Sequence, residues 1–127
     1  FLIDAVNPEK SIDTIAPCDL FLCYYVFERL PTPEYALRIL KLSHQLLREG
    51  GMAIIQIKYP STSASTRSRR WNYAKNLANN VTFGIEEFWM HAEQKGLTPR
   101  LIQLVPKVAE LHDERYAYFT LTKDSHR

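Results

Sequence analysis

The stretch "DLFLCYYVFERLPTPEYALRILKLSHQLLREGGMAIIQIKY", residues 19–59, contains the pattern that decides the fold. It begins with a continuous apolar and aromatic run over 19–26, typical of a strand covered on both faces. It ends with "MAIIQIKY" (52–59), which predicts a second buried strand. A helical pattern separates the two runs, so the stretch predicts a strand–helix–strand crossover whose two strands are parallel.

The helix between these strands has signals at both ends. Thr32 is a good N-cap residue, and Pro33 suits the first helical position. The pair Gly50-Gly51 is expected to end the helix. Apolar or small residues recur at three- and four-residue spacing and predict one buried helix face: Ala36, Ile39, Leu40, Ser43, Leu46 and Leu47.

The rest of the chain continues the alternation of strands and helices. Residues 1–4 form a short apolar run, and a clear helical pattern over 82–96 begins with a threonine suited to cap it. A weaker helical pattern covers 69–80. Strands are expected over 100–106 and 114–123. Their connection is too short for a parallel crossover, so this last pair should form an antiparallel hairpin.

Composition favours one soluble domain over residues 1–127, with 46% hydrophobic and 24% charged residues. A net charge of +2 gives no support to a nucleic-acid partner. Cys18 and Cys23 should point to opposite faces of a strand, and two free thiols fit a reducing cytoplasm. No apolar run reaches the length of a membrane span. Because the chain opens on Phe1 within an apolar run, we expect a piece of a longer polypeptide.

Most of the chain resembles the carboxyl-terminal portion of a class I S-adenosylmethionine-dependent methyltransferase, from the third strand onward. That family's fourth strand carries an acid, an apolar run, a small or sulfur residue, a Leu-Glu-His-Leu-like run and a proline. The corresponding residues here are Asp19, "LFL", Cys23, "VFERL" and Pro31. "GIEEFWMHAEQKGLTPRLIQLVP" resembles the late helix and sixth strand, and "RYAYFTLTK" the seventh, antiparallel strand. The family's glycine-rich loop and the acid that ends its second strand have no counterpart here.

The resemblance implies an α/β, Rossmann-like, doubly wound and mostly parallel sheet, closed by an antiparallel C-terminal hairpin. It also implies that S-adenosylmethionine is the cofactor, although the chain would carry only part of the cofactor site. "IDAVN" is similar to the end of the family's third strand, so the resemblance places an Asp-Ala pair near the adenine. Ligands of open parallel sheets bind beyond the carboxyl ends of the strands, where tyrosine rings could face the sulfonium. The candidate cofactor residues are Asp4, Ala5, Cys23, Tyr24 and Tyr25.

Two further residues are candidates for binding the substrate, the methyl acceptor. Arg29 lies where the family often has His, and Tyr59 follows the fifth strand, where the family often lines its substrate cavity. Residues 60–82 would form a lid or insert that shapes this pocket. Each assignment has a structural alternative. Arg29 could form a solvated pair with Glu28, and Tyr59 could rest on the turn after it.

The cofactor candidates have structural alternatives as well. Tyr24 and Tyr25 could simply pack under the helix, and Asp4 could initiate a turn. Arginines, Trp71 and Tyr73 within residues 67–75 could bind nucleic acid, but the near-neutral charge favours a solvated insert. No spacing suggests a metal site, and no residue stands out as a catalytic base.

The function that these features favour is methyl transfer from S-adenosylmethionine to a small-molecule acceptor. Methyl transfer needs mainly in-line positioning and exclusion of water, so the lack of an obvious base does not oppose it. The alternative is a non-catalytic, methyltransferase-like module that serves as a binding or regulatory surface. Another doubly wound nucleotide-binding domain is a third possibility, because a fold alone does not fix function.

Overall fold

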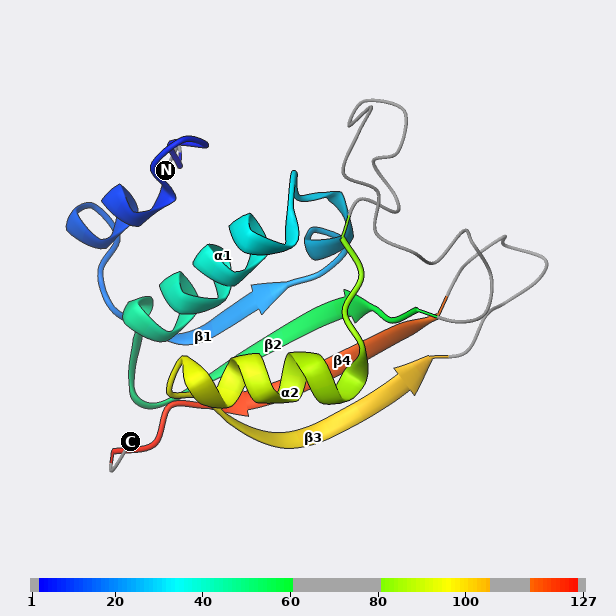
Figure 1. Ribbon diagram of the computed structural model, residues 1–127. Coiled ribbons are helices and arrows are strands. Elements are labelled where there is room, and N and C mark those ends of the chain that lie inside the picture. Colours follow the sequence, from blue (N-terminus) through cyan, green and yellow to red (C-terminus); the bar gives the residue numbers. More distant parts are fainter. Residues whose placement is uncertain (1–2, 61–80, 106–114, 126–127) are drawn as a thin grey trace.

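The computed structural model describes residues 3–60, 81–105 and 115–125 (Figure 1). Two α-helices and four strands account for most of these residues, together with two short 3-10 helices. In chain order the elements are η1 (Pro8–Asp13), β1 (Cys18–Cys23), η2 (Phe27–Arg29), α1 (Pro33–Leu46), β2 (Leu47–Lys58), α2 (Ile85–Gln94), β3 (Thr98–Val105) and β4 (Tyr116–Thr122).

The strands form one mixed sheet in the order β1-β2-β4-β3. β1 and β2 are parallel, and Leu22 lies beside Ile54. β4 is antiparallel to both of its neighbours, so β1, β2 and β3 all run in one direction. This arrangement confirms the predicted crossover, the C-terminal hairpin and the prevailing parallel direction. It also places β4 between two strands that precede it in the chain.

Helix α1 begins as predicted but ends earlier. The Thr32 side chain accepts a hydrogen bond from the Tyr35 N–H at 3.0 Å. The helix ends at Leu46, so the prediction that Gly50-Gly51 would end it is wrong, and both glycines lie in β2. The cause is Lys123, whose backbone pairs with Gly50 and Gly51 at 2.6 and 2.9 Å. Its ammonium group also binds the carbonyls at the end of the helix, those of His44 and Leu47.

Three other element boundaries differ from prediction. Ile3 and Asp4, the described part of the predicted strand 1–4, lie outside any strand. β1 ends at Cys23 because Tyr25 takes a left-handed φ of 57°. The N-cap of α2 is Gly84, because the Phe83 N–H donates to the Lys58 carbonyl and so extends the chain past the expected cap. Residues 61–80, which include most of the predicted insert, lie outside the described residues.

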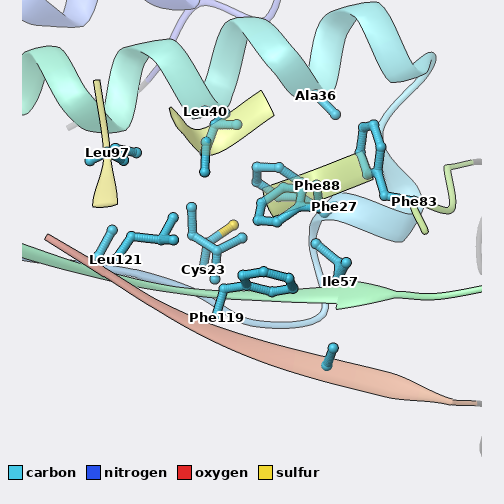
Figure 2. Close-up of a cluster of buried hydrophobic side chains, with 14 of the residues drawn as sticks. Cys23, Phe27, Ala36, Leu40, Ile57, Phe83, Phe88, Leu97, Phe119 and Leu121 are labelled. Atoms are coloured by element: carbon cyan, nitrogen blue, oxygen red, sulfur yellow. The ribbon is translucent and has the colours of Figure 1, made fainter. Parts of the chain in front are cut away.

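Both helices pack on the same face of the sheet, which we call the covered face. Figure 2 shows Phe27, Phe88 and Phe119 gathered between the helices and the sheet. The rings of Phe88 and Phe119 are 4.8 Å apart at their centres, and both are fully buried. Burial of such large aromatic side chains is the main favourable term in a core of this size. The strand residues of the covered face are Cys23, Ala53, Ile55, Ile57, Ala117, Phe119 and Leu121.

The opposite face of the sheet is apolar as well, and we call it the open face. No described helix packs on it, and Leu20 and Leu22 of β1 are 50% and 54% exposed. Within the described part of the chain, no helix is long and apolar enough to cross a membrane. The strand residues of the open face include Leu20, Leu22, Met52, Ile54, Gln56, Lys58, Leu101, Gln103, Val105, Tyr116, Tyr118, Thr120 and Thr122.

Candidate functional site

Tyr24 and Tyr25 lie beyond the carboxyl end of β1, where an open α/β sheet binds its ligands. In an extended strand, consecutive side chains would point to opposite faces. The left-handed backbone at Tyr25 changes this, and both rings pack against β4. Tyr24 meets Tyr118 edge to face at 5.5 Å, and Tyr25 meets Tyr116 at 5.4 Å. Tyr24 and Tyr25 remain 45% and 47% exposed, so a ligand can reach their rings.

Gln56 lies beneath these rings on β2 and is completely buried. Its side-chain oxygen accepts the backbone N–H of Tyr25, and its side-chain nitrogen donates to the Tyr118 hydroxyl at 3.1 Å. One amide group therefore joins the end of β1 to β2 and β4. Because a buried amide must be hydrogen-bonded, this arrangement favours one orientation of the Tyr24-Tyr25 turn.

Glu28 and Lys58 add two buried charged groups beside the tyrosines. The Tyr116 hydroxyl donates to the Glu28 carboxylate at 3.4 Å, and the Lys58 ammonium group lies 5.9 Å from the centre of the Tyr116 ring. The Val81 N–H donates to the Glu28 carbonyl at 3.2 Å. The alternative of a solvated Glu28-Arg29 pair is wrong for Glu28, because packing against Tyr116 buries this carboxylate while Arg29 stays exposed.

Cys23 contributes its backbone to the strand end, because its side chain lies in the core of the covered face. Burial, and secondarily the negative charge of Glu28, raises the pKa of the Cys23 thiol to about 12. The thiol therefore stays protonated near neutral pH and is a poor nucleophile. Both cysteines are free thiols, as predicted.

Of the two predicted substrate residues, Tyr59 lies on the covered face, away from the tyrosine rings. Tyr59 packs against the core of the covered face and lines a hollow of about 470 Å³ beside the start of α2. Arg29 lies in η2 with an exposed side chain. The structure therefore places Tyr59 apart from Tyr24 and Tyr25, with the sheet between them.

Asp4 and Ala5 belong to a segment that is attached to α1. The Asp4 carboxylate accepts the N–H groups of Val6 and Asn7 at 2.9 and 3.2 Å, and these bonds lower its pKa. These contacts are those of a turn-initiating Asp, the structural alternative given for Asp4. The Ala5 carbonyl accepts a hydrogen bond from the Tyr35 hydroxyl at 2.6 Å. Within the described ranges, no hydrogen bond, ion pair or ring contact connects this pair with Tyr24 or Tyr25.

The sequence analysis missed the residues that support the tyrosine rings from below. The available signal was polar residues alternating with isoleucines at the end of β2, in "IIQIKY". A second signal was the spacing of two tyrosines on β4, which puts both rings on one face. No group of three potential metal-binding side chains occurs among the residues with described positions. The missed residues are Glu28, Gln56, Lys58, Tyr116 and Tyr118.

Comparison with solved structures finds the same fold in methyltransferases. An N1-methyltransferase from Burkholderia thailandensis, solved with 1,6-didemethyltoxoflavin and S-adenosylhomocysteine, matches 93% of this chain and 49% of its own, with 20% identity and a TM-score of 0.67. An O-methyltransferase family protein from the same species matches 100% of this chain and 36% of its own, with 12% identity and a TM-score of 0.66. An enzyme described as catalysing a pericyclic reaction matches 86% of this chain and 27% of its own, with 11% identity and a TM-score of 0.58.

No protein-family model matches the sequence, and no curated protein matches it significantly. The chain spans about half or less of the length of the three solved structures. The comparisons show that this chain has the predicted fold, an α/β Rossmann-like sheet that forms part of a methyltransferase fold. They show the fold alone, since one of these neighbours is described by a different reaction.

Proposed function

We propose that this chain forms the carboxyl-terminal part of an S-adenosylmethionine-dependent methyltransferase that acts on a small molecule. The observation that carries the proposal is the exposed tyrosine pair at the carboxyl end of β1, in a sheet with β4 inserted between β2 and β3. A solved protein with this fold holds S-adenosylhomocysteine and a small heteroaromatic compound. Two free thiols fit the cytoplasm as its location.

The tyrosine pair suits a ligand with a positively charged sulfur. A cation over an aromatic face gains about 0.5–2 kcal/mol, and the exposed rings of Tyr24 and Tyr25 offer such faces. Because Gln56 already accepts the Tyr25 N–H, we assign ligand contact to the rings and to the backbone near Cys23. When bound, S-adenosylmethionine would supply an activated methyl group. We assign Asp4 and Ala5 to its adenine side.

The acceptor side of the proposed site involves Arg29 and Tyr59. Arg29 is exposed close to the tyrosine pair in sequence, and Tyr59 lines the hollow beside α2. We assign both residues to acceptor binding, as the family resemblance implies. The chain's own contribution to methyl transfer would be to orient the reactants and exclude water, which can account for a large share of such a rate enhancement.

Isothermal titration of the longer polypeptide with S-adenosylhomocysteine tests the cofactor assignment. We expect saturable binding, and we expect Tyr24→Ala to weaken S-adenosylmethionine more than S-adenosylhomocysteine, since only the former is cationic. Equal losses for the two ligands would remove the charge-specific role of Tyr24. Absence of binding by the unaltered polypeptide would contradict the proposed function.

A second candidate function is a non-catalytic module or an enzyme of another class. It is favoured by the neighbour described as a pericyclic reaction enzyme, because the same fold there serves a different reaction. Binding of S-adenosylmethionine without methyl transfer to any acceptor in a broad panel of phenols, amines and heteroaromatic compounds would support this candidate. Product formation with S-adenosylhomocysteine release would support the methyltransferase.

A further inference from the structure

We infer that Gln56 is the positioning residue that sets the orientation of the Tyr24-Tyr25 turn for ligand binding. The inference deepens the proposed function and rests on it. It begins with Tyr25, the non-glycine residue of the described chain with a positive φ, which is 57°. Such a conformation is unfavourable for a residue other than glycine. It persists only where surrounding contacts impose it.

Gln56 makes the contact that imposes this conformation. Its buried side-chain oxygen accepts the Tyr25 N–H directly, across 31 positions of sequence. The side-chain nitrogen of Gln56 donates to the Tyr118 hydroxyl at 3.1 Å. This second hydrogen bond fixes which way the Gln56 amide faces. The amide is thus oriented from β4 and in turn orients the end of β1.

The consequence is that both rings reach tyrosines of β4 on one face. Tyr24 packs edge to face on Tyr118, the same residue that orients the Gln56 amide. Tyr25 packs on Tyr116, two positions away on β4. If Tyr25 returned to an extended backbone, its ring would point to the other face of the sheet. Gln56 would therefore control ligand affinity without touching the ligand.

Gln56→Met tests this inference, because methionine has a similar length and removes both hydrogen bonds. The matched control is Gln103→Met, which makes the same change at an exposed position of β3 that also lies beside Tyr118. In the longer polypeptide we expect Gln56→Met to raise the Kd for S-adenosylhomocysteine about tenfold. The control should change it less than about twofold.

Two further measurements separate positioning from a general loss of stability. Misplaced rings should weaken the binding of S-adenosylmethionine by about threefold more than the binding of S-adenosylhomocysteine. General destabilisation should weaken the binding of both ligands alike. In a Tyr25→Gly background the left-handed backbone is readily adopted and the ring is absent. Adding Gln56→Met to this background should raise the Kd for S-adenosylhomocysteine by less than about threefold. An undiminished tenfold loss in that background would overturn the inference.

The remaining outcomes are also decisive. If the unaltered polypeptide binds S-adenosylhomocysteine and Gln56→Met binds it as tightly as Gln103→Met does, the inference is wrong and the proposed function stands. If the unaltered polypeptide does not bind, the proposed function fails and the inference fails with it. If Gln56→Met does not fold, Tyr118→Phe replaces it, because this variant removes only the hydroxyl that orients the amide. A Kd unchanged by Tyr118→Phe would then overturn the inference.

Discussion

Both faces of the sheet carry apolar strand residues, but the two faces have different surroundings. On the covered face, Ile55 and Phe119 are fully buried beneath α1 and α2. On the open face, Leu20 and Leu22 of the edge strand β1 are about half exposed, while Gln56 of the inner strand β2 is fully buried. The comparison teaches that apolar strand residues predict the strands but not which face is packed. The buried residues of the open face, Gln56, Lys58 and Tyr116, lie on the inner strands β2 and β4 near the tyrosine pair.

The largest expected difference between the faces is in stability. Phe119→Ala removes a buried ring that packs on Phe88 and should lower the free energy of unfolding by about 3–5 kcal/mol. Thr120→Ala, one position along β4 and on the open face, should cost less than about 1 kcal/mol. Urea unfolding followed by circular dichroism measures both. Equal costs would mean that the two faces are equally packed.

The next effect concerns the buried polar end of the open face. Tyr116→Phe removes the hydroxyl that donates to the buried Glu28 carboxylate and should cost about 1–3 kcal/mol. Tyr35→Phe is the matched control, because its hydroxyl donates to an exposed carbonyl that water can serve instead. We expect the control to cost clearly less in the same urea titration. A harmless Tyr116→Phe would show that the Glu28 carboxylate does not depend on this bond.

The third prediction concerns the pH dependence of stability that the buried Cys23 thiol produces. The Cys23 thiol has its pKa raised from 9.0 to about 12, so above pH 9 the unfolded chain loses this proton while the folded chain keeps it. Its contribution to stability is therefore fully present below pH 9 and is lost as pH rises towards 12, by at most about 1.4 kcal/mol per pH unit.

Comparing variants isolates this contribution from other groups that titrate at high pH. Between pH 9 and pH 10 the unaltered chain should lose about 1 kcal/mol more than Cys23→Ala does. Cys18→Ala keeps the buried thiol and should retain the full slope. Parallel curves for the unaltered chain and Cys23→Ala would show that the folded state does not hold the thiol in its protonated form.

Local signals in the sequence predicted most of the elements. Thr32 and Pro33 marked the start of α1, and the short connection after β3 indicated the antiparallel hairpin. The end of α1 was mispredicted because the cause is Lys123, which pairs with Gly50 and Gly51 from far along the chain. The spacing of apolar residues reflects only neighbours in sequence. It could not reveal a backbone partner such as Lys123, which follows β4.

The same limit applies to the candidate site. The sequence indicated Tyr24 and Tyr25 because they follow a buried strand, but not the left-handed backbone that turns both rings onto β4. That conformation depends on Gln56, which lies 31 positions later. Tyr59 was predicted to bind the substrate because it follows the next buried strand. It follows β2 three positions after Gln56, an odd spacing, and its ring packs against the core of the covered face.

The smallest expected effect on stability is at the exposed edge strand of the open face. Leu22 is 54% exposed, so Leu22→Lys should change the free energy of unfolding by less than about 0.5 kcal/mol. The effect on association should be clear, because β1 is at an edge of the described sheet and presents unpaired backbone groups beside exposed leucines. Such an edge is a template for pairing between chains, and an added lysine opposes it. We therefore expect residues 1–127 alone to self-associate in sedimentation velocity and Leu22→Lys to shift them towards monomer. A monomeric unaltered chain would contradict the association, and a loss of 2 kcal/mol or more in Leu22→Lys would show that this face is covered after all.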